Sequence, residues 1–130
     1  MSAGTRELSV LVVEDSEDDL ELLLLELRRG GWKPTYERVE TPGALREALA
    51  RQRWDIVLSD YAMPAFTGLD AFRIVREAGL DLPFVLVSGT VGEERAVEAV
   101  KSGIHDYLLK GQLTRLEAEL GHIELQVGFI

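Results

Sequence analysis

The sequence predicts an α/β fold: a doubly wound parallel sheet of five strands that alternate with five helices in three layers. Short apolar, β-branched runs alternate along the chain with longer segments of helical period. The 130 residues leave no room for a second domain. Because strand–helix crossovers are right-handed, repeats at this spacing place parallel strands together and helices on both faces of the sheet.

Each expected element has its own signal. The run at 8–13 is almost continuously apolar, which is typical of a strand buried on both faces. A leucine-rich helix over 18–29 ends at a pair of glycines, and the more polar run at 35–39 indicates an edge strand. The helix over 41–51 begins with a threonine cap and a proline in its first turn. The remaining elements are strands at 54–59, 83–87 and 105–109, and helices at 68–78, 93–101 and from Gln112.

Composition and charge exclude several classes of function. A net charge of −9 argues against direct nucleic-acid binding, which needs clustered Lys and Arg. The absence of cysteine excludes disulfides, thiolate metal sites and cysteine nucleophiles. The N-terminus is polar, and the apolar stretch at 10–13 is too short for a signal peptide or a membrane span. We therefore expect a cytoplasmic protein with no membrane partner.

Polar side chains gather where the expected strands end. Glu14 and Asp15 follow the first strand, Asp60 the third, Ser88 the fourth and Lys110 the fifth. Ligands of such sheets bind beyond the carboxyl ends of the strands, so these groups should converge. Crowded carboxylates repel one another unless a cation is present, and an oxygen-only site that keeps waters suits Mg²⁺. An aspartate in such a site can accept a phosphoryl group.

The same residues also have structural interpretations. Ser16 and Asp19 fit a capping box, so part of the acidic run simply starts a helix. Asp60 alone is compatible with a turn before a proline and a glycine. Lys110 fits a solvated loop, and Ser88 an ordinary turn. The functional interpretation depends on all of them falling at strand ends together.

In four segments the chain resembles the receiver domains of two-component response regulators: VLVVEDSEDD, DIVLSDYAMPAFTGLDAF, PFVLVSGT and DYLLKG. These segments have the order and spacing of that family. The resemblance implies a receiver domain over residues 8–120, an N-terminal tail over 1–7 and a C-terminal tail of undetermined structure over 121–130. It also implies the flavodoxin-like strand order 2-1-3-4-5.

The resemblance assigns the metal site residue by residue. It implies that Asp60 is the phosphoacceptor and binds Mg²⁺ together with Asp15 and the backbone carbonyl of Ala62. Glu14, where the family more often has aspartate, is expected to act through a water molecule. Mn²⁺ is expected to substitute for Mg²⁺.

The resemblance further implies a switch. A histidine kinase or phosphotransfer protein passes a phosphoryl group from its phosphohistidine to Asp60, and Lys110 and Ser88 hold the phosphoryl oxygens. Ser88 then moves, Tyr107 swings inward, and the surface formed by helix 93–101, strand 105–109 and the last helix changes. An effector protein or an output domain outside this chain responds. The same surface, or the C-terminal tail, is the expected site of homodimerisation, and the chain catalyses only its own phosphorylation and dephosphorylation.

Two departures from the family affect the loops of the site. Gly111 replaces the usual proline after the lysine, and a cis bond without proline costs about 2.5–4 kcal/mol, so a trans Lys110–Gly111 peptide is expected. Ala62 and Thr90 occupy positions that help or hinder the hydrolytic water. Neither is a strong general base, which predicts slow autodephosphorylation.

The last segment leaves two conformations open. Its apolar residues are spaced by three and four, as in a coiled-coil seam, at Leu113, Leu116, Leu120, Ile123, Val127 and Ile130. Gly121 and Gly128 oppose a continuous helix, and residues 123–129 alternate with strand period. We favour a helix that ends near Gly121, followed by an extended apolar tail.

Three other functions compete with the receiver interpretation. An aspartate-nucleophile phosphatase typically has a second acid two residues after the nucleophile, where this chain has Ala62. A degenerate receiver would serve only as an interaction or dimerisation module, but all five key positions carry competent side chains. A flavin-binding protein shares the fold, yet the chain has no Ser/Thr/Gly-rich loop after its first strand.

Overall fold

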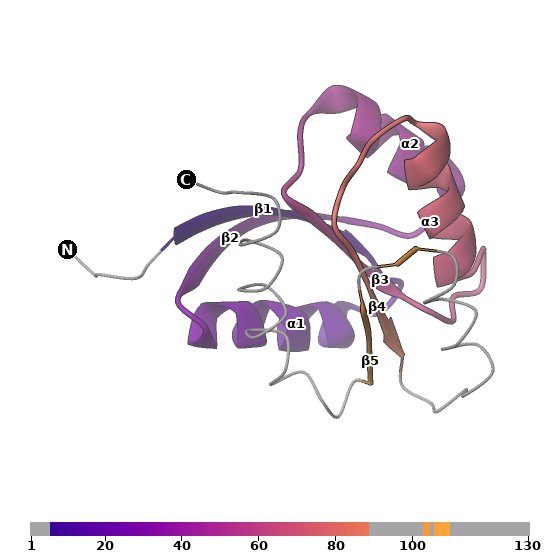
Figure 1. Cartoon of the computed structure of the whole chain (residues 1–130). Helices are drawn as coiled ribbons and strands as arrows, with labels where there is room; N and C mark the ends of the chain where they lie inside the picture. The colour runs from indigo at the N-terminus through magenta and orange to yellow at the C-terminus, as the bar shows by residue number, and fades with distance from the viewer. Residues whose placement is uncertain (1–5, 89–102, 105, 110–130) are drawn as a thin grey trace.

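The computed structural model describes residues 6–88, 103–104 and 106–109, with the backbone alone for residues 6, 106, 107 and 109. Five parallel strands form one sheet in the order β2-β1-β3-β4-β5 (Figure 1). This confirms the predicted strand order. The strands are β1 (Arg6–Val13), β2 (Trp32–Val39), β3 (Ile56–Asp60), β4 (Phe84–Ser88) and β5 (Asp106–Leu109).

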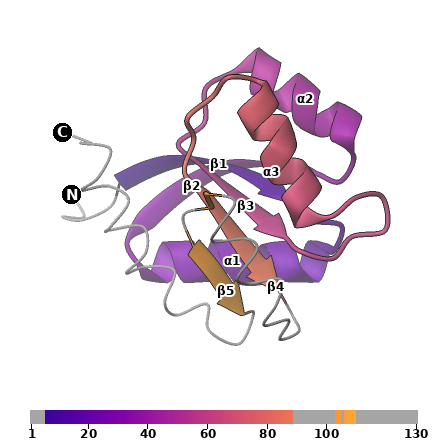
Figure 2. The ribbon, with the colours of Figure 1, turned by 45° about the vertical axis from the view of Figure 1, so that its right-hand side comes forward.

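In the part of the chain that the structure describes, three helices cover the two faces of the sheet. Helix α1 (Glu17–Arg29) lies on one face, and α2 (Pro42–Arg51) and α3 (Gly68–Glu77) lie on the other (Figures 1 and 2). The predicted doubly wound, three-layer architecture is therefore confirmed. The helices expected over 93–101 and from Gln112 lie outside the described residues. Among the described helices, none has the length and apolarity that crossing a membrane requires.

The alternation of side chains along β1 explains its continuous apolar sequence. Val10 and Val12 pack in the cluster that contains the buried leucines of α1. Leu11 and Val13 point the other way, into the cluster beneath α2 and α3. Successive residues of a strand face opposite sides, so a strand covered on both faces needs apolar residues at every position.

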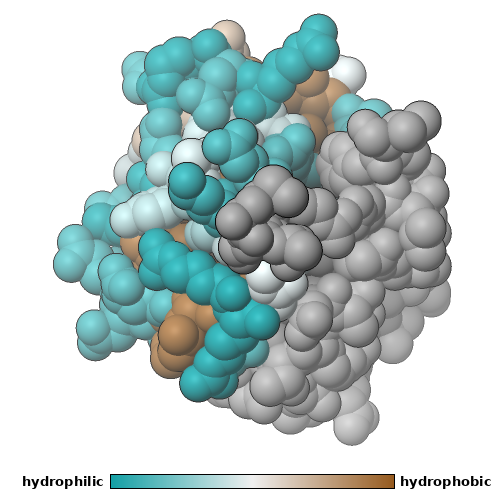
Figure 3. Space-filling view, turned by 90° about the vertical axis from the view of Figure 1, so that its left-hand side faces the viewer, coloured by the Kyte–Doolittle hydropathy of each residue, from teal (hydrophilic) through white to brown (hydrophobic). Residues whose placement is uncertain are grey.

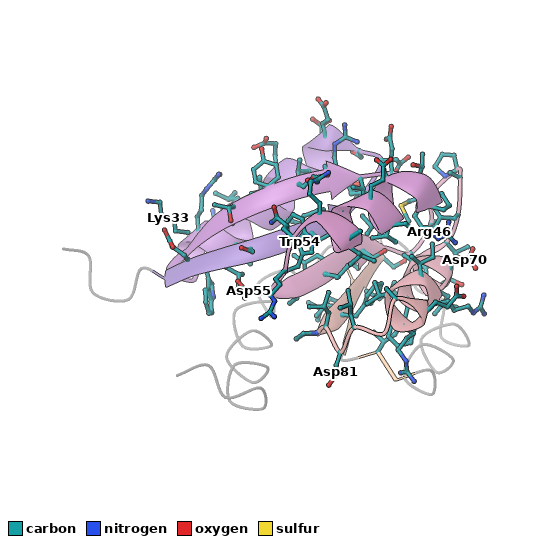
Figure 4. All side chains as sticks on the ribbon, turned by 90° about the horizontal axis from the view of Figure 1, so that it is seen from above. Lys33, Arg46, Trp54, Asp55, Asp70 and Asp81 are labelled. Carbon is teal, nitrogen blue, oxygen red and sulfur yellow. The ribbon has the colours of Figure 1, made fainter. Side chains whose placement is uncertain are left out.

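Strand β3 begins two residues later than the sequence predicts. Trp54 is buried, but its indole N–H donates to the carbonyl of Ala48 at 2.9 Å and so attaches α2 to the sheet. The Asp55 carboxylate binds β1 by accepting the N–H of Ser9 at 2.7 Å. Trp54 and Asp55 thus form a link before the strand (Figure 4), and regular pairing starts at Ile56.

Strands β1 and β2 are longer than expected. Arg6 and Glu7, assigned to the N-terminal tail, belong to β1 and pair with Trp32 and Lys33. Strand β2 therefore starts three residues before the predicted Thr35. Its side chains are mostly exposed or half-buried between two buried ends, which is why its apolar pattern is weak.

Strand β2 is an edge strand, as predicted, and its outer edge contains a proline. The Glu14 N–H donates to the Val39 carbonyl at 3.0 Å, so the backbone groups of odd-numbered β2 residues face β1. Even-numbered residues, including Pro34, then direct their backbone groups outward. Proline has no N–H, and its place on an edge strand limits pairing with another chain. Among the coloured residues, the surface around the starts of β1 and β2 is mainly hydrophilic (Figure 3).

Candidate metal and phosphoryl site

The sheet register brings the three candidate acids together. Val13 and Ser59 form the last pair between β1 and β3, so Glu14 and Asp60 are the next residues of the two segments. Glu14, Asp15 and Asp60 each offer a carboxylate oxygen, and these oxygens all lie within 4.8 Å of one another. Glu14 and Asp60 are buried, with exposed fractions of 1% and 7%, whereas Asp15 is exposed.

This donor set fits a hard divalent cation. Carboxylates at such separations repel one another, and burial deprives two of them of the water that would screen the repulsion. An ion relieves this repulsion. Oxygen ligands favour Mg²⁺, Ca²⁺ or Mn²⁺ over metals that prefer nitrogen and sulfur, and the exposed member leaves an open side for water and a phosphoryl group.

Glu14 is held by the turn that follows β1. Its carboxylate Oε2 accepts the N–H of Ser16 at 3.2 Å, and its own N–H donates to Val39. The Ser16 hydroxyl caps α1 by accepting the N–H of Asp19 at 3.3 Å, as predicted. The backbone half of the expected capping box differs, because the Ser16 N–H donates to Glu14. The acid site and the helix start therefore share one turn.

Asp60 is the last residue of β3 rather than the first residue after it. The next residue, Tyr61, donates its N–H to the Val87 carbonyl at 2.9 Å and accepts the N–H of Gly68 at 2.8 Å. A β-carbon at Gly68 would lie 2.3 Å from Leu86 Cδ1 and 2.6 Å from the Asp60 carbonyl. Only glycine lets α3 start this close to the end of β3.

The loop between β3 and α3 contains Ala62, which is exposed two residues after Asp60. It ends at a complete capping box that the sequence analysis did not identify. Thr67 Oγ1 accepts the N–H of Asp70 at 3.2 Å, and the Asp70 carboxylate accepts the N–H of Thr67 at 3.1 Å. The box fixes the first turn of α3 and hence the end of the loop. Its Thr-x-x-Asp spacing was a readable signal.

Of the other predicted site residues, the structure describes some and not others. Ser88 is buried at the end of β4, one residue after the Val87–Asp60 pair, so it lies beside the end of β3. Tyr107 lies in β5, paired with Leu86. Lys110, Thr90 and Gly111 lie outside the described residues, as does the predicted trans peptide before Gly111.

Arg38 is a contact of the acid site that the sequence analysis missed. Its Nη1 donates to the backbone carbonyl of Glu14 at 3.3 Å. The only available signal was a basic residue near the end of a strand beside the acid pair. By contrast, a cavity of about 460 Å³ lined by Trp54, Leu80 and Leu82 adjoins the start of β3, the end opposite to Asp60.

Comparisons with known proteins agree with this geometry. Residues 10–120 match the family model of the response regulator receiver domain. The two-component response regulator ARR11 of Arabidopsis thaliana is 40% identical over 110 residues, which are 79% of this chain and 20% of that protein. The response regulator protein FleR of Pseudomonas aeruginosa is 35% identical over 101 residues, 78% of this chain and 21% of that protein.

A solved structure shows the same fold. The response regulator receiver domain protein from Clostridium thermocellum superposes with a TM-score of 0.79 and 20% identity, covering 93% of this chain and 97% of that one. This chain spans about a fifth of the length of the two response regulators above. The family match includes β2 to β5 and all three clustered acids. The chain therefore belongs to the family of response regulator receiver domains.

Proposed function

We propose that the chain accepts a phosphoryl group on Asp60 in a Mg²⁺-dependent reaction, as a receiver in two-component signal transduction. The observation that carries this proposal is the meeting of three carboxylates within 4.8 Å at the carboxyl ends of β1 and β3. In parallel sheets this edge is where ligands bind. Membership of the receiver family supports the same assignment.

The described residues suit distinct roles in this site. Asp15 and Asp60 would hold Mg²⁺ or Mn²⁺ directly, with the Ala62 carbonyl, and Glu14 would act through a water molecule. When bound, the ion supplies positive charge to the oxygens of the transferring group. Ser88, buried beside the end of β3, would donate a hydrogen bond to a phosphoryl oxygen. Lys110, which lies outside the described residues, would donate to another.

The transfer itself needs one nucleophile. A carboxylate oxygen of Asp60 attacks phosphorus, the bond from phosphorus to the donor's imidazole nitrogen breaks, and the electron pair returns to the imidazole. The donor is the phosphohistidine of a histidine kinase or phosphotransfer protein. The product is an acyl phosphate on Asp60. The chain modifies itself and turns over no separate substrate.

The phosphoryl group carries a charge of about −1.5 to −2 in place of the single charge of the Asp60 carboxylate, and this change drives the switch. Ser88 turns toward the phosphoryl group, Tyr107 moves inward, and the surface around β5 changes its population of two conformations. This surface or the C-terminal tail would serve homodimerisation. The signal then passes, in the cytoplasm, to an effector protein or to an output domain. The two relatives compared above continue beyond the fifth of their length that this chain matches.

The direct test is labelling by acetyl phosphate. Wild-type protein with Mg²⁺ is expected to gain the mass of one phosphoryl group, and excess EDTA should prevent the gain. Asp60→Asn replaces the nucleophilic carboxylate by a neutral amide and should abolish labelling, which intact-protein mass spectrometry measures.

Asp81→Asn is the matched control, because Asp81 is an exposed aspartate on the segment that leads into β4 (Figure 4). This variant should label like the wild type. Labelling of Asp60→Asn at the wild-type rate would contradict the proposal, as would labelling that EDTA leaves unchanged.

A further inference from the structure

One guanidinium group joins three segments around the acid site. Arg38 is the second-last residue of β2, and its Nη1 donates to the Glu14 carbonyl at 3.3 Å and to Glu40 Oε2 at 3.1 Å. Its Nη2 lies 3.6 Å from Glu17 Oε1. The side chain is 26% exposed. Arg38 thus connects the residue after β1, the first residue of α1 and the link between β2 and α2.

The contact completes the backbone pairing at the end of β1. The N–H of Glu14 donates to Val39, the last residue of β2. The ladder between β1 and β2 ends with the pair of Val13 and Val39. Just beyond it, the side chain of Arg38 donates to the carbonyl of Glu14. The Glu14 carboxylate accepts from Ser16 in the same turn. Two neighbouring residues of β2 therefore hold both backbone polar groups of Glu14.

We infer that Arg38 is a positioning residue for the metal site, which fixes the turn that presents Glu14 and Asp15 to Mg²⁺. This inference rests on the proposed function. Groups that orient metal ligands influence affinity strongly, because the ligands are then already in place when the ion arrives. A planar guanidinium suits this role, since its several donors have fixed directions and can serve three acceptors together.

The charge of Arg38 and its positioning role have opposite consequences for Mg²⁺. A cation beside the site repels Mg²⁺, so its removal alone would strengthen binding. Positioning predicts weaker binding after the same change. Two carboxylates with exposed fractions of 82% and 52% already offset the guanidinium charge, and solvent screens what is left. The positioning effect should therefore outweigh the charge effect, so that Mg²⁺ affinity falls when Arg38 is replaced.

The test is a titration of the whole chain with MgCl₂ by isothermal calorimetry, comparing wild type, Arg38→Gln and Arg38→Lys. Arg38→Gln should weaken Mg²⁺ binding by about tenfold. Arg38→Lys keeps the positive charge but lacks the several fixed donors of the guanidinium group, and it should also bind Mg²⁺ more weakly than the wild type. In acetyl phosphate labelling, the Mg²⁺ concentration for half-maximal rate should rise by the same factor, while the rate at saturating Mg²⁺ stays near the wild-type value.

Arg51→Gln is the matched control. Arg51, the last residue of α2, is ion-paired with Glu37, which precedes Arg38 in β2. Adjacent strand residues point to opposite faces, so this pair lies on the other side of β2 from Arg38. The variant loses one arginine charge and one ion pair without touching the turn. Its Mg²⁺ affinity should equal that of the wild type.

Several results would overturn the inference. Arg38→Gln that binds Mg²⁺ as tightly as the wild type, or more tightly, shows that Arg38 does not position the turn, and so does a loss equalled by Arg51→Gln. A lower saturating rate with unchanged Mg²⁺ dependence has the same meaning. If Arg38→Gln does not fold, as judged by circular dichroism without metal, Arg38→Lys decides. Absence of Mg²⁺ binding by the wild type would instead overturn the proposed function as well.

Discussion

Gly68 lies where helix α3 approaches the end of β3, and one added methyl group tests that approach. In Gly68→Ala the new β-carbon would meet Leu86 Cδ1 at 2.3 Å and the Asp60 carbonyl at 2.6 Å. Because the backbone oxygen cannot move away without moving Asp60, we expect the free energy of unfolding to fall by about 1–3 kcal/mol. Phosphorylation by acetyl phosphate should slow as well. Urea denaturation and intact mass measure the two effects.

Gly43→Ala is the control for this substitution. Gly43 lies in the first turn of α2, and a β-carbon there would meet nothing within 4 Å. The variant should keep the wild-type labelling rate and gain up to about 1 kcal/mol, since alanine is the better helix former. Equal losses of stability in both variants would show that crowding at β3 is not the cause.

Residues of the site differ in how far the sequence could identify them. Glu14, Asp15 and Asp60 were predictable, because each follows or ends an apolar run and parallel strands end at one edge. Arg38 was not, since its bond to the Glu14 carbonyl spans 24 residues and depends on how far a side chain reaches. Gly68 was expected as the first residue of a helix, but the reason for a glycine there, contact with Leu86 and Asp60, needs the packed structure.

At the scale of elements, apolar content alone misplaced several strand starts, and those of β3 and β2 show the reasons. Trp54 was assigned to β3 because it is large and apolar, whereas its indole N–H requires the Ala48 carbonyl on α2. Such a partner is invisible in a local pattern. The start of β2 was missed for the opposite reason. Lys33 and Pro34 are poor strand residues, and only pairing with β1 makes them part of the sheet.

The outer edge of β2 provides a prediction at this scale. Pro34→Val restores an outward N–H on the edge strand and should promote association of two copies through this edge. The free energy of unfolding of the monomer should change by less than about 1 kcal/mol. Sedimentation velocity at rising protein concentration should show a dimer that the wild type, measured without phosphodonor, forms less readily.

Thr35→Val is the control for edge pairing. Thr35 is exposed and also gains apolar area, but its N–H already faces β1. The variant therefore adds no outward donor and should sediment like the wild type. Association of both variants to the same extent would attribute the effect to apolar area rather than to the backbone edge.

At the scale of the whole molecule, the acid site opposes stability in the absence of metal. The chain has a net charge of −9, and three of its carboxylates are crowded at one edge of the sheet. Repulsion among them favours the unfolded chain, where they separate. Because Mg²⁺ binds only the folded arrangement, binding stabilises the fold by mass action, about 2.7 kcal/mol at an ion concentration 100 times the Kd.

Asp15→Asn should reverse the order of stabilities with and without metal. Without Mg²⁺ the variant loses one repelling charge, so its free energy of unfolding should exceed that of the wild type by up to about 1 kcal/mol, the scale of exposed charge interactions. With Mg²⁺ the free energy of unfolding of the wild type should rise by about 2–3 kcal/mol, and that of the variant, which lacks a ligand, by far less.

Asp18→Asn is the control, because it changes the net charge equally but Asp18 lies in the first turn of α1, outside the cluster. It should lose about 0.3–1 kcal/mol without metal, because a carboxylate there favours the helix dipole, and keep the full Mg²⁺ gain. Urea denaturation in EDTA and in MgCl₂ measures all three proteins, and parallel gains for Asp15→Asn and the wild type would remove Asp15 from the metal site.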